Sequence, residues 1–302
     1  MARRLQIALG AVGALLVLAA VLVKWVAAPA LVEISLDDPS VTVSEGDATY
    51  LGAKIKVVAT RTVVQDDKTS TGDVAVWDET LCLVNATEKV DKDGCAAKSI
   101  PDSLPLKSTD RVAIDRQSAE AVNDTKFNAN INGRPVTHEG VDYTFPLATE
   151  KKTYKMFDAN AGKAYEATFA GEESIKGVDT YKFDTEVKPD AAVTIIGAPA
   201  TYYSKRSVWV EPTTGVIVKG VQQITERLGG TPVFEGTVTF TDKTQQQQAD
   251  FAKDQKNKIA LIRWWIPAIL LAVGVVMVAV AWFVGRRKPP AVPAQEREPL
   301  TV

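Results

Sequence analysis

Two long apolar segments constrain this sequence more than any other feature. The first covers residues 5–23 and the second covers residues 264–284. Each is about 20 residues long, which is the length that a helix needs to cross the ~30 Å hydrocarbon core of a bilayer at 1.5 Å per residue. The pattern therefore predicts a transmembrane helix near each end of the chain, with the bulk of the sequence between them.

Basic residues flank the outer ends of both segments and predict their orientation. Arg3 and Arg4 precede the first segment, and a basic run at 286–288 follows the second. By the positive-inside rule, both termini are cytoplasmic and the main domain is extracytoplasmic, at the cell membrane. A cleaved signal peptide ending near Ala28-Pro29-Ala30 is an alternative for the first segment. An h-region usually has only about 7–15 residues, so an uncleaved anchor is favoured.

Aromatic residues mark the predicted membrane boundaries. Trp and Tyr are enriched at both membrane–water interfaces. Pro267 falls in the first turn of the second segment, where the loss of a backbone donor costs least. The predicted interface anchors are Trp25, Arg263, Trp264, Trp265 and Trp282.

Composition divides the chain further. Residues 244–263 are polar, rich in Gln, Ala and Lys, and free of Gly and Pro, which favours a helical stalk; a flexible linker is the alternative. The tail after the second segment is rich in Pro and is predicted to be disordered. The expected divisions are a cytoplasmic stub (1–4), a transmembrane helix or signal anchor (5–27), an extracytoplasmic β domain (33–243), the stalk (244–263), a transmembrane helix (264–284) and a disordered cytoplasmic tail (285–302).

Charge argues against one class of partner. The whole chain has a net charge of −2, but residues 33–262 contain 27 Lys and Arg against 35 Asp and Glu, a net charge of −8. Nucleic-acid binding needs a basic face that neutralises phosphates. The sequence therefore predicts no nucleic-acid partner and membrane lipid as the first partner.

The two cysteines of the chain are Cys82 and Cys95. An even number in an exported domain predicts a disulfide, and Asp91-Lys92-Asp93-Gly94 between them is a turn sequence. Two free thiols are the alternative.

The central domain is predicted to be mostly β, an antiparallel sheet, sandwich or open barrel. Short runs with strand character are separated by turn signals, without helical patterns between them. Turns are expected at 132–135, 176–177, 211–215 and 229–232. The predicted strands are residues 53–64, 73–84, 111–115, 119–122, 142–145, 152–157, 163–170, 179–188, 201–210, 216–227 and 233–241.

A search for catalytic chemistry finds no motif. His138 is the one histidine, and its setting in Thr137-His138-Glu139-Gly140 predicts a solvated loop. Two Cys and one His are too few for a zinc site, and the sequence has no phosphate loop and no nucleophile elbow. The sequence therefore predicts no catalytic residue, no metal site and no cofactor, and a protein that is not an enzyme.

The segment Ala-Ala-Val-Thr-Ile-Ile-Gly-Ala-Pro-Ala-Thr-Tyr-Tyr at 191–203 is apolar and uncharged. A buried strand and turn would explain it. A flap over an apolar cavity or a surface facing lipid is the functional interpretation. The candidate ligand or lipid contacts are Val193, Ile195, Ile196, Tyr202 and Tyr203.

Four segments carry a resemblance to a known family. They are VAIDRQSAEAV (112–122), YTFPLATEKKTYKMFD (143–158), GEESIKGVDTYKF (171–183) and VWVEPTTGVIVKG (208–220). With both apolar segments, they resemble the actinobacterial family labelled porin PorA. The resemblance implies an envelope protein of mycolate-type actinobacteria or their relatives, and it carries over no catalytic residue. Outer-membrane porins are closed barrels of lipid-facing strands, whereas the spans predicted here are helical.

A second similarity concerns residues 171–241. Gly171 and Gly177, then Tyr181-Lys182-Phe183 and the Val208–Gly215 segment, are similar to the strand pairs of periplasmic lipoprotein-carrier domains. Those domains are half-barrels with an apolar cavity, so the similarity bears on fold first and on function only through that fold.

Three functions remain open. The favoured hypothesis is a membrane-anchored, non-enzymatic protein whose β domain binds or transfers a hydrophobic envelope component. The alternative is a channel-forming, porin-type protein that acts as a homo-oligomer. The third is an envelope enzyme, or a structural protein with an envelope protein partner. The spans are almost free of polar side chains, with Gln6 in the first, and a water-filled pore needs such side chains.

Overall fold

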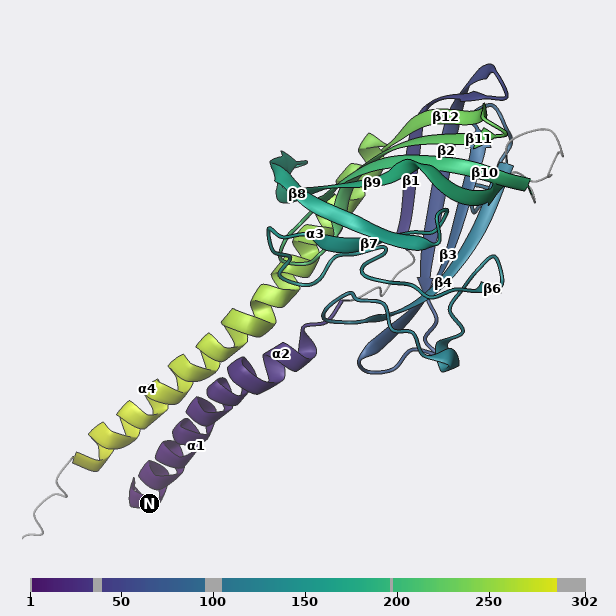
Figure 1. Ribbon diagram of the computed structural model, residues 1–302. Coiled ribbons are helices and arrows are strands. Elements are labelled where there is room, and N and C mark those ends of the chain that lie inside the picture. Colours follow the sequence, from purple (N-terminus) through teal and green to yellow (C-terminus); the bar gives the residue numbers. More distant parts are fainter. Residues whose placement is uncertain (1, 35–39, 96–104, 196–197, 287–302) are drawn as a thin grey trace, which may run out of the picture. The chain divides into compact units, whose positions relative to one another are not determined.

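The computed structural model describes residues 2–34, 40–95, 105–195 and 198–286, and it divides the chain into two compact units. One unit contains residues 1–32 and 258–302, and the other contains residues 33–257. The first unit is helical and the second is dominated by one sheet (Figure 1). The predicted disordered tail at 285–302 lies almost wholly outside the described residues.

The helical unit contains both apolar segments. The first forms α1 (Ala2–Leu22), a π-helical stretch (Val23–Ala27) and the short α2 (Ala28–Leu31). The second forms a π-helical stretch (Leu261–Trp265) and α4 (Ile266–Arg286). By length and hydropathy, Arg4–Ala27 and part of Asp242–Arg286 are long and apolar enough to cross a membrane. Helices of this kind satisfy their own backbone hydrogen bonds, as a bilayer requires.

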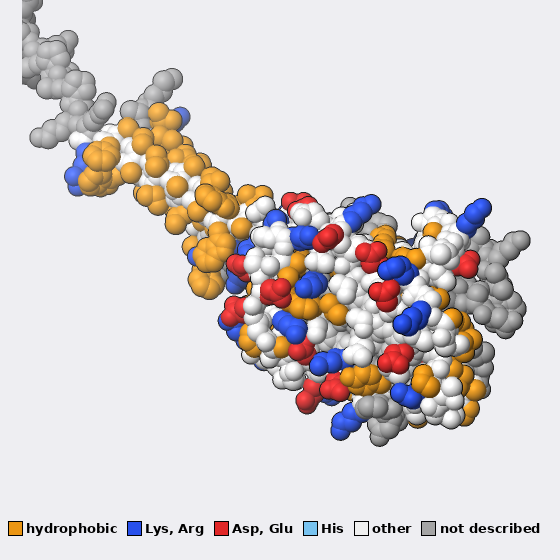
Figure 2. Space-filling model, turned by 90° about the horizontal axis from the view of Figure 1, so that it is seen from above, with side chains coloured by type: hydrophobic (Ala, Val, Ile, Leu, Met, Phe, Trp, Pro, Cys, Tyr) orange, Lys and Arg blue, Asp and Glu red, His pale blue; other side chains and the backbone are white. Residues whose placement is uncertain are grey.

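Two glycines allow α1 and α4 to pack closely. A Cβ atom added to Gly13 would lie 2.8 Å from the carbonyl oxygen of Gly274, and one added to Gly274 would lie 2.8 Å from that of Gly13. Small residues at such a crossing let two backbones touch, which is how helices associate in lipid where no hydrophobic force drives them together. Most other large apolar side chains of both helices are exposed (Figure 2).

The tryptophans at the ends of these helices have cationic neighbours. The Lys24 Nζ atom lies 4.7 Å from the centre of the Trp264 ring, and the Arg286 guanidinium lies 3.5 Å from that of Trp282. Trp25 and Trp265 are also largely exposed. An exposed tryptophan ring beside a cation suits the headgroup region of a membrane. The role of these tryptophans as interface anchors stays a prediction.

The second unit is built on one antiparallel sheet of 12 strands. From edge to edge its order is β6-β5-β4-β3-β2-β1-β12-β11-β10-β9-β8-β7. The strands are β1 (Ser40–Tyr50), β2 (Ala53–Gln65), β3 (Val74–Asn85), β4 (Pro105–Asp115), β5 (Asn130–Ile131), β6 (Arg134–Pro135), β7 (Tyr154–Asp158), β8 (Lys163–Ile175), β9 (Val178–Ile195), β10 (Ala198–Val210), β11 (Ile217–Leu228) and β12 (Thr231–Phe240).

The sheet is strongly curved but not closed. Trp77 and Val112, near one edge, and Phe183 and Val208, near the other, belong to one buried cluster. The two ends of the sheet therefore face each other across a concave inner face, and part of the connection between β4 and β7 fills the space between them. Among the described residues, the two edge strands β6 and β7 do not pair with each other. The predicted fold class, a mostly antiparallel β domain between two apolar helices, is confirmed.

Alternation along each strand separates the inner face from an outer one. Val208 and Val210 face inward, whereas Trp209 between them packs outward with Ala249 and Ala252 of α3 (Asp242–Ala260). The helix α3 thus covers part of the outer face. It contains most of residues 244–263, for which the sequence favoured a helix.

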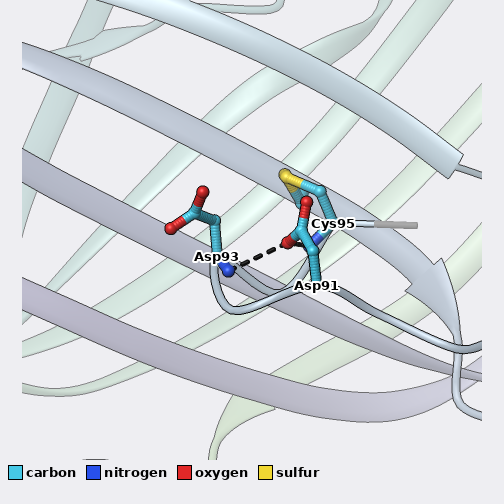
Figure 3. Close-up of a disulfide and its surroundings, with 4 residues drawn as sticks. Asp91, Asp93 and Cys95 are labelled. Atoms are coloured by element: carbon cyan, nitrogen blue, oxygen red, sulfur yellow. Dashed lines mark hydrogen bonds between the residues drawn. A yellow bond between two sulfur atoms is a disulfide. The ribbon is translucent and has the colours of Figure 1, made fainter. Parts of the chain in front are cut away.

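The disulfide also lies on the outer face. Cys82 of β3 is bonded to Cys95, and the chain between them turns back at Asp91, whose carboxylate accepts hydrogen bonds from the backbone N–H groups of Asp93 and Cys95 (Figure 3). Gly94 has a φ of +77°, and a Cβ atom there would lie 2.4 Å from the Thr60 hydroxyl oxygen. The turn needs glycine at this position for both reasons.

Three expectations about strands were wrong. Residues 119–122 form no strand, only an isolated bridge between Ala121 and Ile114. Residues 142–145 form no strand either; they belong to the connection that fills the inner face. Strand β1 was not predicted at all, yet it joins β2 to β12 at the centre of the sheet. Its sequence includes Glu45, Gly46 and Asp47, so it lacks the apolar alternation by which strands are recognised.

Candidate functional site

The inner face contains an apolar section that is only partly covered. Ala48, Val57 and Phe234 are buried there. Around them lie Tyr50, Ile55, Leu83, Ile224 and Val238, each partly buried and packed against the buried three. These eight residues come from five neighbouring strands, β3, β2, β1, β12 and β11, and are called the inner apolar patch below.

The predicted ligand contacts are distributed over both faces. In the β9–β10 pairing Val193 is opposite Ala200 and Ala191 is opposite Tyr202, so Val193 and Tyr202 share the inner face. Tyr203 is the next residue along β10 and is directed to the outer face. Ile195 ends β9, and Ile196 lies outside the described residues. Because Tyr202 and Tyr203 lie on opposite faces of the sheet, they cannot line one site.

Tyr202 is a buried polar residue of the inner face. Its hydroxyl donates to Asp158 Oδ2 at 3.1 Å, and the same carboxylate oxygen lies 3.6 Å from an Arg206 guanidinium nitrogen. Burial raises the pKa of Tyr202, and the charge of Asp158 raises it further. A phenol that is neutral and hydrogen-bonded is thus a stable member of this interior.

A second polar group surrounds His138 and is called the His138 cluster. His138 is 1% exposed, and its Nε2 atom lies 2.9 Å from Asp110 Oδ1 and 3.9 Å from Asp142 Oδ2. The Tyr143 hydroxyl donates to Asp110 Oδ2 at 2.7 Å. Asp110 is an inner-face residue of β4, and the other three belong to the connection between β6 and β7.

Two charged residues of neighbouring strands complete the cluster. Arg61 of β2 donates from Nε to Glu79 Oε1 of β3 at 2.9 Å. Glu79 is opposite Asp110 in the β3–β4 pairing. Burial raises the pKa of Glu79, although the nearby Arg61 opposes that effect. The cluster thus places three carboxylates within one buried region.

Asp142 has the least compensated charge of the three. Its Oδ2 atom is buried and has no hydrogen-bond partner among the described residues. Burial raises the pKa of Asp142 well above its ordinary value, and the negative charge of Asp110 acts in the same direction. An ionised carboxylate in such a place is expensive unless a proton or a cation compensates it.

The expectation of a solvated loop for His138 was wrong. The residues around it are polar, but the loop folds inward, and the His138 ring packs 4.4 Å, centre to centre, from the Phe157 ring. Asp110 is 28 residues away in sequence, so spacing could not connect the two. The polar residues at inner-face positions of strands, such as Glu79 and Asp110, were a weak sequence signal for a buried polar cluster.

The family model described as Porin PorA matches residues 6–283. The chain belongs to this family. The match takes in both apolar segments and the whole sheet, which confirms the resemblance noted from the four sequence segments.

Two curated relatives share the family name. A Porin PorA of Corynebacterium amycolatum is 28% identical over 172 residues, which cover 41% of this chain and 45% of that protein. A Porin PorA of Corynebacterium resistens is 36% identical over 100 residues, 30% of this chain and 24% of that protein. The chain therefore aligns with less than half the length of these relatives. The family and the two apolar helices together make this a membrane protein of the cell envelope.

Proposed function

We propose that this protein is a non-enzymatic, channel-forming envelope protein that acts as a homo-oligomer. The match to the Porin PorA family over residues 6–283 carries this proposal. The matched region takes in the β domain and nearly all of both apolar helices.

The oligomer is required on physical grounds. The described part of the two spans offers few polar side chains, and the pair α1–α4 encloses no water-filled interior because its backbones touch at Gly13 and Gly274. A conducting path through such helices needs several pairs around a common axis, or a path formed by the β domains. The exposed apolar side chains of both helices supply surface for contact with lipid and with further copies.

Planar-bilayer recording of the purified full-length protein tests this function. We expect discrete conductance steps whose frequency rises steeply with protein concentration, because assembly precedes conduction. The matched control is Gly274→Val, in which the added side chain separates α1 from α4 and assembly of the correct helix pair is lost. Two results would count against a channel: no conductance steps with folded wild-type protein, or the same conductance with Gly274→Val as with wild type.

A second function, binding of a hydrophobic envelope component, is favoured by the inner apolar patch. Five of its eight residues are only partly buried, so apolar surface on a concave face remains available. A bound acyl chain would gain about 25 cal/mol for each Å² of apolar surface removed from water. Of the contacts first identified from sequence, Val193 and Tyr202 share this inner face and would extend the proposed contact surface.

Two neighbouring residues of β12 provide a matched test. Val238 belongs to the inner apolar patch, whereas Thr237 is exposed and directed to the outer face. Val238→Asp should reduce the lipid that co-purifies with the protein, as measured by mass spectrometry, and Thr237→Asp should not. Equal lipid content in both variants and wild type would refute binding at this face.

The proposed topology places both termini in the cytoplasm and the β domain outside. It rests on the basic residues that flank both spans. A reporter that is active only outside the cytoplasm should work when inserted at Gly133, which is an exposed turn residue, and fail when fused after residue 302. Activity of the C-terminal fusion would contradict two spans with this orientation.

A further inference from the structure

The His138 cluster has the donor set and spacing of a metal site. One imidazole nitrogen and two carboxylate oxygens, from His138, Asp110 and Asp142, all lie within 4.8 Å of one another. Metal–ligand bonds of about 2.0–2.2 Å separate neighbouring donors by roughly 3.0–3.5 Å. The distances from His138 Nε2, 2.9 Å to Asp110 Oδ1 and 3.9 Å to Asp142 Oδ2, straddle that range. No separation among the three donors exceeds 4.8 Å, so shifts of up to about 1 Å would place all three around one ion.

Charge supports a divalent cation. Within the same interior, Glu79 is paired with Arg61, and Asp158 is paired with Arg206. Asp110 and Asp142 have no Lys or Arg within ion-pair distance among the residues that the structure describes; their shared neighbour is His138. One divalent cation would neutralise both carboxylates while the imidazole stays uncharged, as a metal ligand must.

An unpartnered atom points independently to a ligand. Asp142 is 8% exposed, and its buried Oδ2 atom, directed toward His138, has no hydrogen-bond partner in the described structure. Buried polar atoms almost always have a partner, and a bound water or ion is one explanation for an atom without one. Coordination would complete Asp142, while Asp110 would retain the Tyr143 hydroxyl on its other oxygen as an outer-shell hydrogen bond.

The backbone around the three donors is held by its own hydrogen bonds. Asn123 donates to the His138 carbonyl at 2.7 Å and accepts from the His138 N–H at 3.1 Å. Gly140 has a φ of +76°, and its neighbour Val141 exchanges hydrogen bonds with the backbone of β7. A Cβ atom on Gly140 would lie 2.2 Å from the Lys155 carbonyl oxygen, so this close approach requires glycine. These contacts hold His138 and Asp142 in a fixed relation to β7, and the Val122 N–H beside Asn123 donates to the Ala113 carbonyl of β4.

We propose that Asp110, His138 and Asp142 bind one divalent first-row transition-metal ion, with Zn²⁺ or Mn²⁺ as the best matches to the donors. Imidazole favours Zn²⁺ over Mg²⁺ and Ca²⁺, and the two carboxylates extend the range to Mn²⁺. The ion has a structural role: it joins the β6–β7 connection to β4 inside the curved sheet. This site is independent of whether the protein conducts ions or binds lipid.

Selective labelling of the single histidine provides a direct test on the wild-type chain. Full-length protein carrying ¹⁵N-histidine, purified in detergent without a polyhistidine tag and treated with chelator, is titrated with ZnCl₂. We expect a shift of the Nε2 resonance that saturates at one equivalent of Zn²⁺, together with a higher Tm. An unchanged imidazole spectrum in folded protein at excess Zn²⁺ would overturn the proposal, and this result needs no variant.

Two variants locate the ion. Asp142→Asn keeps the shape of a ligand but removes its charge, and Asp158→Asn removes a buried inner-face carboxylate outside the proposed site. We expect Zn²⁺ affinity, measured by calorimetry, to fall about tenfold or more in Asp142→Asn and to stay within twofold in Asp158→Asn. The Zn²⁺-dependent rise in Tm should disappear with Asp142→Asn alone. Unchanged affinity in folded Asp142→Asn would place the ion elsewhere and refute this site.

Discussion

Removal of the Cys82–Cys95 disulfide should lower the stability of the β domain by a calculable amount. The double substitution Cys82→Ala and Cys95→Ala breaks the crosslink without leaving a free thiol. The two cysteines are 13 residues apart, so the crosslink closes a loop of about 14 residues. In the chain-entropy model, that loop contributes about 3 kcal/mol through the unfolded state.

Lost packing adds a smaller effect. Cys82 is fully buried and Cys95 is 7% exposed. Truncation of both side chains removes buried sulfur atoms, which together account for about 1 kcal/mol more. For a domain of about 150–250 residues, 1 kcal/mol corresponds to roughly 2–4 °C in Tm. For a total of about 4 kcal/mol, the expected decrease is therefore about 8–16 °C.

Differential scanning fluorimetry of the full-length protein in detergent measures this change. Trp77 and Trp209 are buried in the sheet and report its unfolding. Wild-type protein that was unfolded and refolded in reductant should approach the Tm of the double variant. A decrease of less than about 2 °C would refute the reasoning, since the hydrogen bonds at Asp91 would then hold the turn without the crosslink.

Three further predictions test other parts of the structure. Gly215→Ala should destabilise the domain by more than about 3 kcal/mol, because the residue has a φ of +76° and its Cβ atom would lie 2.0 Å from the Phe145 carbonyl oxygen. A reduced yield and a urea transition at lower concentration would show this. A wild-type urea midpoint would contradict the steric argument. Burial raises the pKa of Glu226 above its unfolded value, so its ionised form weakens the fold at pH 7 and that penalty disappears as the pH falls through the folded pKa. Glu226→Gln should therefore be more stable than wild type at pH 7, with a difference in midpoint that shrinks toward pH 4; a constant difference would exclude titration as the cause. Gly13→Val should separate α1 from α4 and reduce disulfide crosslinking between cysteines introduced at Gly10 and Ala281, which are in contact in the native pair; undiminished crosslinking would show that the glycine contact is dispensable.

The local properties of this chain were readable from sequence because they depend on residues close together. The two apolar segments need no partner to form helices in lipid, since each satisfies its own backbone hydrogen bonds. The β-rich domain followed from short alternating runs between turn residues such as Glu211–Gly215. The disulfide followed from an even cysteine count with a turn between the two residues, and the sheet brings Cys82 and Cys95 together as expected.

The interior was decided by long-range pairing alone. Strand β1 has no apolar pattern of its own, yet pairing with β2 and β12 on its two sides makes it the centre of the sheet. Alternation along β10 separates Tyr202 from Tyr203, which the uncharged sequence had suggested as one site. His138 meets Asp110 only because the curved sheet draws the β6–β7 connection inward, and sequence spacing does not contain that information. Burial then changes the chemistry of these groups, since a carboxylate that water would solvate on a loop must find a proton or a cation inside the fold.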